Sequence, residues 1–130
     1  MIRVLSLSTL FPSPARPAFG KFVANQMRAV AATGRCDVTV INPLGIPPWP
    51  LRLREPCATL AACPDHSSLD VIPVHHPRFL TIPVIGGDTN PRRLARAVLP
   101  LVRKLHKERP FDLVDAQFFY PDGPAAASVA

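Results

Sequence analysis

The 130-residue sequence predicts an α/β fold in which a parallel sheet is flanked by helices. Short apolar segments alternate along the chain with longer segments whose apolar residues recur at helical spacing, and this alternation is typical of βαβ units. The composition is 48% hydrophobic and 18% charged, as in a globular domain and unlike a disordered chain. Length and composition together predict a single domain over residues 1–130.

The first part of the chain predicts a strand, a helix and a second strand. Residues 2–10 are short and mostly apolar, as in a strand buried on both faces, and a proline-rich loop leads from there to Gly20. From Lys21 onward apolar residues share one helical face, and Gly34 is expected to end the helix. Residues 36–42 form the second strand. Because short turns join these elements, the two strands are expected to be parallel with a right-handed crossover.

The middle of the chain is less regular. Residues 43–69 show no usable periodicity and are expected to form a long irregular loop. Residues 70–75 predict a third strand, which contains Pro73. Since proline cannot donate a ladder hydrogen bond, this strand is expected at a sheet edge or at a bulge.

A second helix is predicted over residues 90–108, with Asn90 as its N-cap and Pro91 at its first position. Its apolar face comprises Leu94, Val98, Leu101, Val102 and Leu105. Its opposite face carries Arg92, Arg93, Arg96, Arg103 and Lys107. Either this basic face is the solvated back of a core-docked helix, or it is attracted to anionic lipid headgroups. Pro100 is expected to kink or split the helix.

A fourth strand is predicted over residues 112–119, followed by a turn and the start of another helix at residues 125–130. The sequence stops one turn into that helix, so we expect the chain to be a fragment or a truncated product. The fold predicted from these elements is a Rossmann-like parallel sheet with flanking helices.

The net charge of +6, with arginine far more frequent than lysine, either has no role in binding or points to one of three classes of partner. These are nucleic acid, an anionic membrane surface and a phosphorylated small molecule. The basic residues are not interleaved with aromatic ones as in proteins that bind single-stranded nucleic acid. We therefore expect no nucleic-acid partner.

The cysteines Cys36, Cys57 and Cys63 follow no framework spacing, which is typical of reduced thiols in a cytosolic protein. Three histidines lie between residues 66 and 76, but the separation of Cys57 and Cys63 does not match the short loop of a structural zinc site. We expect no metal and no cofactor. No apolar run approaches the roughly 20 residues that span a bilayer, so the protein is expected to be cytoplasmic.

Ligands of open parallel sheets bind beyond the carboxyl ends of the strands, where two predicted turns lie. One is the turn at Gly20 and Lys21, where the amides at the start of a helix can bind an anion. The other contains Tyr120, Asp122 and Gly123, and Asp122 is either a helix cap or a ligand of a sugar or phosphate. We expect both turns to face one crevice.

Several other chemistries find no support in the sequence. The first loop has no Gly-x-Gly-x-x-Gly and no Walker pattern, which argues against nicotinamide and P-loop sites. No Ser/His/Asp set occurs in a credible order. From the residues alone, the prediction is an α/β domain with a cleft that tolerates anions.

Five segments, in order along the chain, resemble glycosyltransferase family 4, the retaining group-1 enzymes with the two-domain GT-B fold. They are residues 3–12 (RVLSLSTLFP), 20–26 (GKFVANQ), 34–41 (GRCDVTVI), 76–83 (HPRFLTIP) and 111–123 (FDLVDAQFFYPDG). The last is the most specific, since it is similar to the Asp-x-Ile-His-Ala-His-x-x-Tyr-Pro-Asp-Gly pattern of the family. The resemblance covers nearly the whole chain.

The resemblance implies a hexosyltransferase-type enzyme that moves a sugar from a nucleotide diphosphate sugar to a sugar or lipid-linked acceptor, with retention of configuration. The chain would be the amino-terminal, acceptor-side half of the GT-B fold. The carboxyl-terminal donor domain, with its Glu-x7-Glu motif, is absent from this sequence, so we expect the fragment to be inactive alone. An enzyme of this kind would be cytoplasmic or peripheral at the inner membrane face.

The implied site residues are Gly20, Lys21, Tyr120, Asp122 and Gly123 for substrate binding, with Gln117 as the catalytic position. This sequence has Asp115 and Gln117 where many members of the family have two histidines. Glutamine can donate and accept hydrogen bonds but cannot titrate, so the role of this position is altered. The alternative reading is a stand-alone, non-catalytic α/β binding module.

Overall fold

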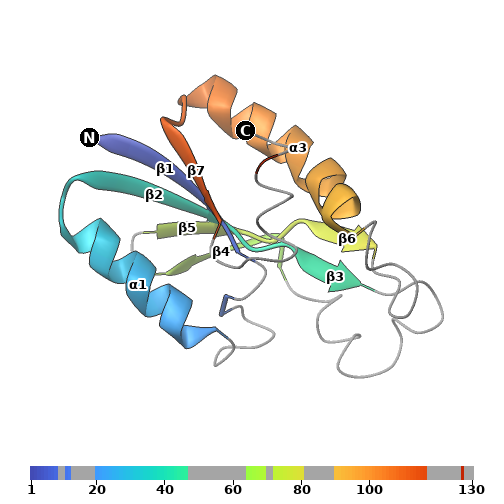
Figure 1. Ribbon diagram of the computed structural model, residues 1–130, viewed down its shortest axis with the longest axis horizontal. Coiled ribbons are helices and arrows are strands. Elements are labelled where there is room, and N and C mark those ends of the chain that lie inside the picture. Colours follow the sequence, from blue (N-terminus) through green and yellow to red (C-terminus); the bar gives the residue numbers. More distant parts are fainter. Residues whose placement is uncertain are drawn as a thin grey trace.

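A five-stranded, mostly parallel sheet with one helix on each face forms the main part of the protein (Figure 1). The computed structural model describes residues 1–8, 11–12, 20–46, 64–69, 72–80, 90–116 and 127. Its elements are β1 (Ile2–Leu7), α1 (Lys21–Ala32), β2 (Cys36–Ile41), β3 (Leu44–Ile46), β4 (His66–Leu69), β5 (Ile72–His75), β6 (Arg78–Leu80), α3 (Asn90–Glu108) and β7 (Leu113–Ala116).

The strands of the main sheet lie in the order β4-β5-β2-β1-β7. The four predicted strands, β1, β2, β5 and β7, pair in parallel, which confirms the predicted α/β fold with a parallel sheet and flanking helices. The sheet extends from β1 through β2 to β5 on one side, and β7 then joins β1 on the other side. The order in which strands are added to the sheet therefore reverses between β1 and β7, although the two strands are parallel.

Three short strands were not predicted. Both β3 and β4 lie within residues 43–69, the stretch for which an irregular loop was expected. The strand β4 pairs antiparallel with β5, and β3 pairs with β6 in a separate two-stranded sheet. With three residues each, β3 and β6 are too short to show a period of two, and β4, with the sequence HSSL, has a single apolar residue, so the sequence pattern carried no signal for them.

Pro73 was expected to place its strand at an edge or at a bulge, and the edge position is wrong, because β5 has β2 on one side and β4 on the other. The carbonyl oxygen of His75 accepts from the amide of Asn42 in the segment after β2, at 2.7 Å. Position 73, two residues earlier, presents its backbone to the same side, where proline has no N–H to donate. The pairing of β5 with β2 accordingly covers only Val74 and His75.

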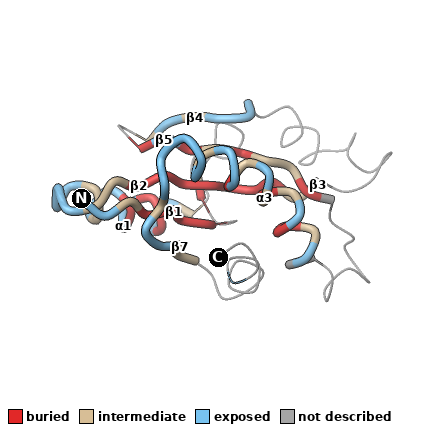
Figure 2. Tube along the Cα trace, turned by 90° about the horizontal axis from the view of Figure 1, so that it is seen from above, coloured by how far each residue is buried: buried red, intermediate tan, exposed pale blue. Residues whose placement is uncertain are grey.

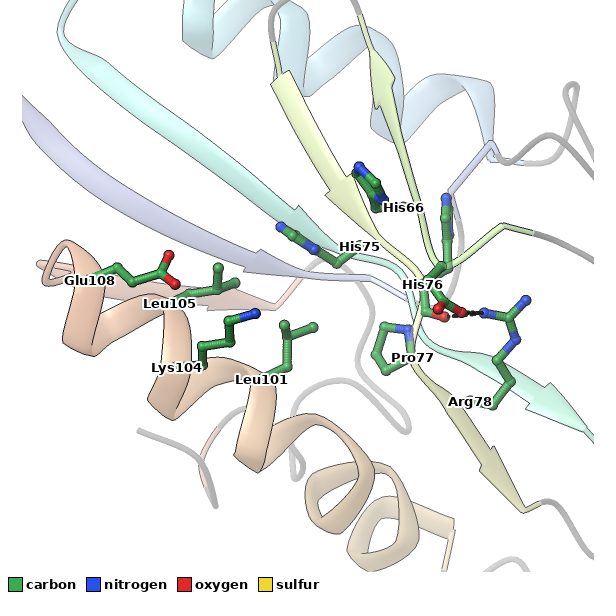
Figure 3. Close-up of a pocket in the computed structure, with 10 residues that line it drawn as sticks. His66, His75, His76, Pro77, Arg78, Leu101, Lys104, Leu105 and Glu108 are labelled. Carbon is green, nitrogen blue, oxygen red and sulfur yellow. Dashed lines mark hydrogen bonds and ion pairs between the residues drawn. The ribbon is translucent and has the colours of Figure 1, made fainter.

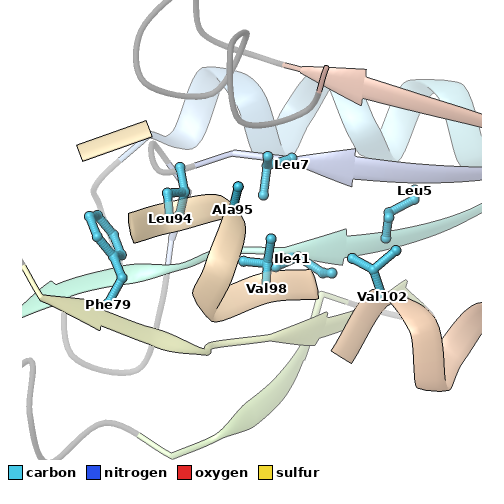
Figure 4. Packing of buried hydrophobic residues seen from close by; sticks show 8 residues of the cluster. All are labelled: Leu5, Leu7, Ile41, Phe79, Leu94, Ala95, Val98 and Val102. Atoms are coloured by element: carbon cyan, nitrogen blue, oxygen red, sulfur yellow. The ribbon is translucent and has the colours of Figure 1, made fainter. Parts of the chain in front are cut away.

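Alternation along the strands divides the core between the two faces of the sheet. Many of the buried residues belong to the central strands β1 and β2 (red in Figure 2). Leu5, Leu7 and Ile41 pack under α3, where they meet Phe79, Leu94, Ala95, Val98 and Val102 (Figure 4). On the other face α1 contributes Val23, Ala24 and Met27, which pack on Val38, Val40, Ile72 and Val74. Each buried Leu or Val contributes about 1.5–3 kcal/mol, so these faces fix the positions of both helices.

The helix bounds follow the predictions closely. Gly34 has a φ of 71°, and its amide donates to the carbonyl of Ala31 at 3.2 Å, as expected of a glycine that ends a helix. Pro100 was expected to kink or split α3, and the split is wrong, because the helix runs unbroken from Asn90 to Glu108. Pro100 and Arg96 are both exposed, so water can satisfy the carbonyl of Arg96, which the missing amide of Pro100 leaves unpaired.

No helix among the described residues is long and apolar enough to cross a membrane.

The amino edge of the sheet is held by charged side chains. Arg3 and Asp37 are cross-strand partners in β1 and β2, and their side chains form an ion pair at 3.3 Å. Arg109, just after α3, reaches the same carboxylate oxygen at 3.1 Å. The Arg3 amide donates to the carboxylate of Asp112 at 2.8 Å, and its guanidinium lies 4.5 Å from the centre of the Phe111 ring. These contacts join β1, β2 and the segment before β7.

Candidate functional site

A row of buried polar residues lies at the carboxyl edge of the sheet, one position beyond three neighbouring parallel strands. Ser8 follows β1, Asn42 follows β2 and His76 follows β5, and none of them is more than 1% exposed. The strand register aligns them, because Ile41 pairs both with Leu7 and with His75. Parallel pairing therefore places Ser8, Asn42 and His76 side by side.

Hydrogen bonds between these residues form one buried network. The side-chain amide of Asn42 donates from Nδ2 to the carbonyl oxygen of Ser8 at 2.8 Å. Its Oδ1 lies 3.0 Å from Nδ1 of His76. The other ring nitrogen, Nε2, lies 2.8 Å from Oγ of Ser67 in β4. The network thus crosses the sheet from β1 to β4 through four residues.

The partners determine the tautomer of His76. A carbonyl oxygen can only accept, so the nitrogen of the Asn42 amide must face Ser8 and its oxygen must face His76. His76 therefore donates from Nδ1, and its Nε2 accepts the hydroxyl proton of Ser67. Burial lowers the pKa of His76, and the positive charge of Arg78 lowers it further, against the opposing effect of the hydrogen bond with Asn42. His76 is neutral at pH 7.

A second feature is an open cleft of about 590 Å³ between β5 and α3 (Figure 3). Its lining residues are Asp65, His66, His75, His76, Pro77, Arg78, Leu101, Lys104, Leu105 and Glu108. His66 and His75 are cross-strand partners whose rings stack with centroids 6.2 Å apart. The volume is that of small-molecule sites, and the lining combines apolar side chains with ionisable ones.

Several charges act on His75 in this cleft. Partial burial lowers its pKa, the charges of His66 and Lys104 lower it further, and Glu108 acts in the opposite direction. Arg78 forms an ion pair with Asp65 at 2.8 Å. Because β2 and β1 separate β5 from β7, the cleft is distinct from the carboxyl ends of β1 and β7.

Of the predicted site residues, Gly20 and Lys21 fall in the described part of the chain. Gly20 precedes α1 in the left-handed conformation, with φ 70° and ψ 28°, and its carbonyl accepts from the amides of Val23 and Ala24. Lys21 is exposed. Gln117, Tyr120, Asp122 and Gly123 lie outside the described residues. The shared crevice expected of the two turns therefore stays a prediction, although β1 and β7 are parallel neighbours.

The site at the carboxyl edge includes residues that sequence reasoning missed. Ser67, His76 and Asn42 come from three separate segments, so no spacing in the chain relates them. The available signal was a polar residue directly after two of the buried strands, at Ser8 and Asn42, and a pair of histidines, His75 and His76, at the end of the third. Ser6 and Asp115, within β1 and β7, form a further hydrogen bond at 3.3 Å.

Within the described ranges, no group of three or more His, Cys, Asp and Glu side chains is placed to hold a metal ion. Cys57 and Cys63 lie outside those ranges, and Cys36 has a free thiol.

No family model, curated protein or solved structure matches the chain. The site is therefore defined by its own geometry: a buried network of polar residues at the carboxyl edge of the sheet, and an open cleft between β5 and α3 that shares His76 with it.

Proposed function

We propose that the chain is the acceptor-side, amino-terminal domain of a retaining glycosyltransferase that uses a nucleotide diphosphate sugar. The observation that carries the proposal is the reversal of strand order between the parallel strands β1 and β7. In open α/β sheets, ligands bind where the strand order reverses, beyond the carboxyl ends of the strands. Residues 3–12 and 111–123, which contain β1 and β7, are also two of the segments that resemble family 4.

The start of α1, at Gly20 and Lys21, can bind an anion. The first amides of a helix have no partner within the helix, and the helix dipole favours negative charge there. The first turn of α1 contains no acidic residue that would compete for these amides, and Lys21 adds an exposed positive charge. A diphosphate of the donor is the anion that the proposed reaction would bring to this end of the helix.

The proposal divides the reaction between two domains. This domain would position the acceptor over the ends of β1 and β7, with Gln117 and Asp122 as further ligands. A carboxyl-terminal domain with a Glu-x7-Glu motif would bind the nucleotide. Closure of the two domains would exclude water, so that the sugar is transferred to the acceptor and not hydrolysed.

The exposed side of α3 supports an anionic, lipid-linked acceptor. Arg92, Arg96, Arg103, Lys104 and Lys107 are exposed there. Near an anionic leaflet, each such charge contributes about 1 kcal/mol of attraction. Co-sedimentation of the chain with phosphatidylglycerol vesicles, but not with phosphatidylcholine vesicles, is the expected result. Equal binding to both would remove this part of the proposal.

The activity is tested on the full-length product of the gene with a panel of uridine and guanosine diphosphate sugars. Transfer with retained anomeric configuration is expected, together with a Glu-x7-Glu motif downstream of residue 130. Lys21→Ala should reduce kcat/KM about tenfold, the equivalent of one charge-assisted hydrogen bond. Arg35→Ala, which removes an exposed charge beyond the other end of α1, should not.

The 130-residue chain alone is expected to transfer no sugar and to bind nucleotide sugars weakly or not at all. Micromolar binding of a nucleotide sugar to this chain, measured by calorimetry, would contradict the proposed division between domains. A folded full-length protein that binds nucleotide sugars but transfers none would favour a non-catalytic binding module instead.

A further inference from the structure

Ser67, His76 and Asn42 form a relay in which a hydroxyl, an imidazole and an amide are joined end to end. Oγ of Ser67 lies 2.8 Å from Nε2 of His76, and Nδ1 of His76 lies 3.0 Å from Oδ1 of Asn42. A nucleophile within hydrogen-bond reach of a base, and a third group that orients the base, is the arrangement that activates serine hydroxyls. We propose that Ser67 is a nucleophile activated by His76 and that it accepts acyl groups from activated carboxylic esters, an activity separate from sugar transfer.

The direction of each hydrogen bond suits this chemistry. Because Asn42 must present its oxygen to His76, the imidazole keeps its proton on Nδ1 and offers the lone pair of Nε2 to Ser67. Burial keeps the pKa of His76 below the usual value, so the ring is an unprotonated base at neutral pH. A neutral base that already holds the hydroxyl proton in a hydrogen bond is ready to take that proton.

The relay runs from the interior to the surface. Asn42 and His76 are at most 1% exposed, whereas Ser67 is partly exposed. Ser67 lies on β4, the last strand on its side of the main sheet among the described residues. A substrate can therefore approach the hydroxyl while water is kept from the base and from Asn42.

Arg78 lies beside the relay. It donates from Nη1 to the carbonyl oxygen of His76 at 2.8 Å, and its charge lowers the pKa of that imidazole. The same nitrogen forms an ion pair with Asp65 at 2.8 Å, which holds Arg78 next to His76.

The reaction balances without any further reagent than water. Oγ of Ser67 bonds to the ester carbonyl carbon while its proton moves to Nε2 of His76. The intermediate then expels the alcohol, which takes that proton and leaves an acyl-serine. Water attacks the acyl-serine with His76 as base, and the carboxylic acid and the free hydroxyl are released.

A fluorophosphonate probe tests the proposal on the 130-residue chain. Such a probe forms an oxygen–phosphorus bond with an activated serine and releases fluoride. Intact mass and peptide mapping should show one label, at Ser67. The label should be absent from Ser67→Ala and unchanged in Ser68→Ala, because Ser68 is the next residue of β4 but lies outside the relay. Urea-unfolded chain should not be labelled.

The pH dependence of labelling separates a catalytic relay from a structural one. The labelling rate should be constant above about pH 6.5 and fall at lower pH, as His76 takes up a proton. His76→Gln should lower the rate about 100-fold or more in a variant whose circular dichroism matches that of the unchanged chain. Should folded chain remain unlabelled at Ser67 after hours at pH 7.5, or should Ser68→Ala lose the label, the proposal is overturned. Neither result bears on glycosyl transfer.

Discussion

The amino edge of the sheet is held by ion pairs between partly exposed side chains, whereas the carboxyl edge is held by hydrogen bonds between buried neutral ones. At the amino edge the carboxylate of Asp37 is shared by Arg3 and Arg109, and Arg109 remains 69% exposed. At the carboxyl edge Asn42 and His76 are almost fully buried. Exposed ion pairs contribute little because water competes for both charges, but a buried polar group that loses its partner has no replacement. Substitutions that remove a hydrogen-bond partner should therefore destabilise the protein more at the carboxyl edge than at the amino edge.

The largest effect is expected from Asn42→Ala. The substitution leaves Nδ1–H of His76 and the carbonyl oxygen of Ser8 without the partner that Asn42 gives them, inside the protein. The free energy of unfolding, measured in urea, should fall by about 3 kcal/mol. The matched control is Asn25→Ala on the exposed face of α1, where a change within about 0.5 kcal/mol is expected. A loss below about 1 kcal/mol for Asn42→Ala would break the comparison.

The next effect is a dependence of stability on pH that belongs to the carboxyl edge. The folded pKa values of His75 and His76 lie below the unfolded value of about 6.5, so the unfolded chain binds more protons just below that pH. Stability from these histidines is complete above about pH 6.5 and is lost as the pH falls toward their folded pKa values. The slope is at most about 1.4 kcal/mol per pH unit for each histidine.

Urea midpoints between pH 8 and pH 5.5 measure this slope. His75→Asn should remove part of it, whereas Asn25→Ala, which changes no titratable group, should leave it unchanged. Stability that rises as the pH falls from 7 to 6 would show that these histidines gain protons more easily in the folded state.

The two ends of α1 offer a matched pair of glycines, one at each edge of the sheet. Gly20 and Gly34 have φ values of 70° and 71°, which L side chains rarely adopt. Alanine at either position should cost about 1–2 kcal/mol of stability. At Gly34 a Cβ would meet nothing within 4 Å, so the cost there is conformational alone. If a diphosphate approaches Gly20, only Gly20→Ala should also lower the transfer activity of the full-length enzyme. Equal activity of the two variants would argue against a ligand at the start of α1.

The smallest effect is expected at the amino edge. Asp37→Asn removes the charge that Arg3 and Arg109 share and should cost about 0.5–1 kcal/mol at low salt. In 1 M NaCl the cost should shrink, because salt screens exposed charges. Asp65→Asn is the control, since Asp65 also pairs with an arginine but its side chain is 97% exposed, and no measurable change is expected. A cost that does not depend on salt would mean that this edge behaves like the buried one.

The sequence by itself determined the elements that have a long enough apolar pattern. The strands β1, β2, β5 and β7 and the helices α1 and α3 lie close to their predicted ranges, because burial of apolar side chains at regular spacing selects one backbone conformation. Gly34 ends α1 for a local reason, the left-handed conformation that glycine tolerates. These features can be predicted from the local sequence, without knowing which elements lie next to them.

Only the tertiary structure decided which elements are neighbours, and the site depends on that. Pairing in parallel register aligned Ser8, Asn42 and His76, and the antiparallel addition of β4 brought Ser67 to the imidazole. Hydrogen bonds between strands are formed by backbone groups that nearly all residues share, so the sequence does not encode them in any local pattern. Proline is the exception because it lacks the N–H. β5 still has a partner on each side, since it pairs with β2 only through Val74 and His75, the two residues after its proline.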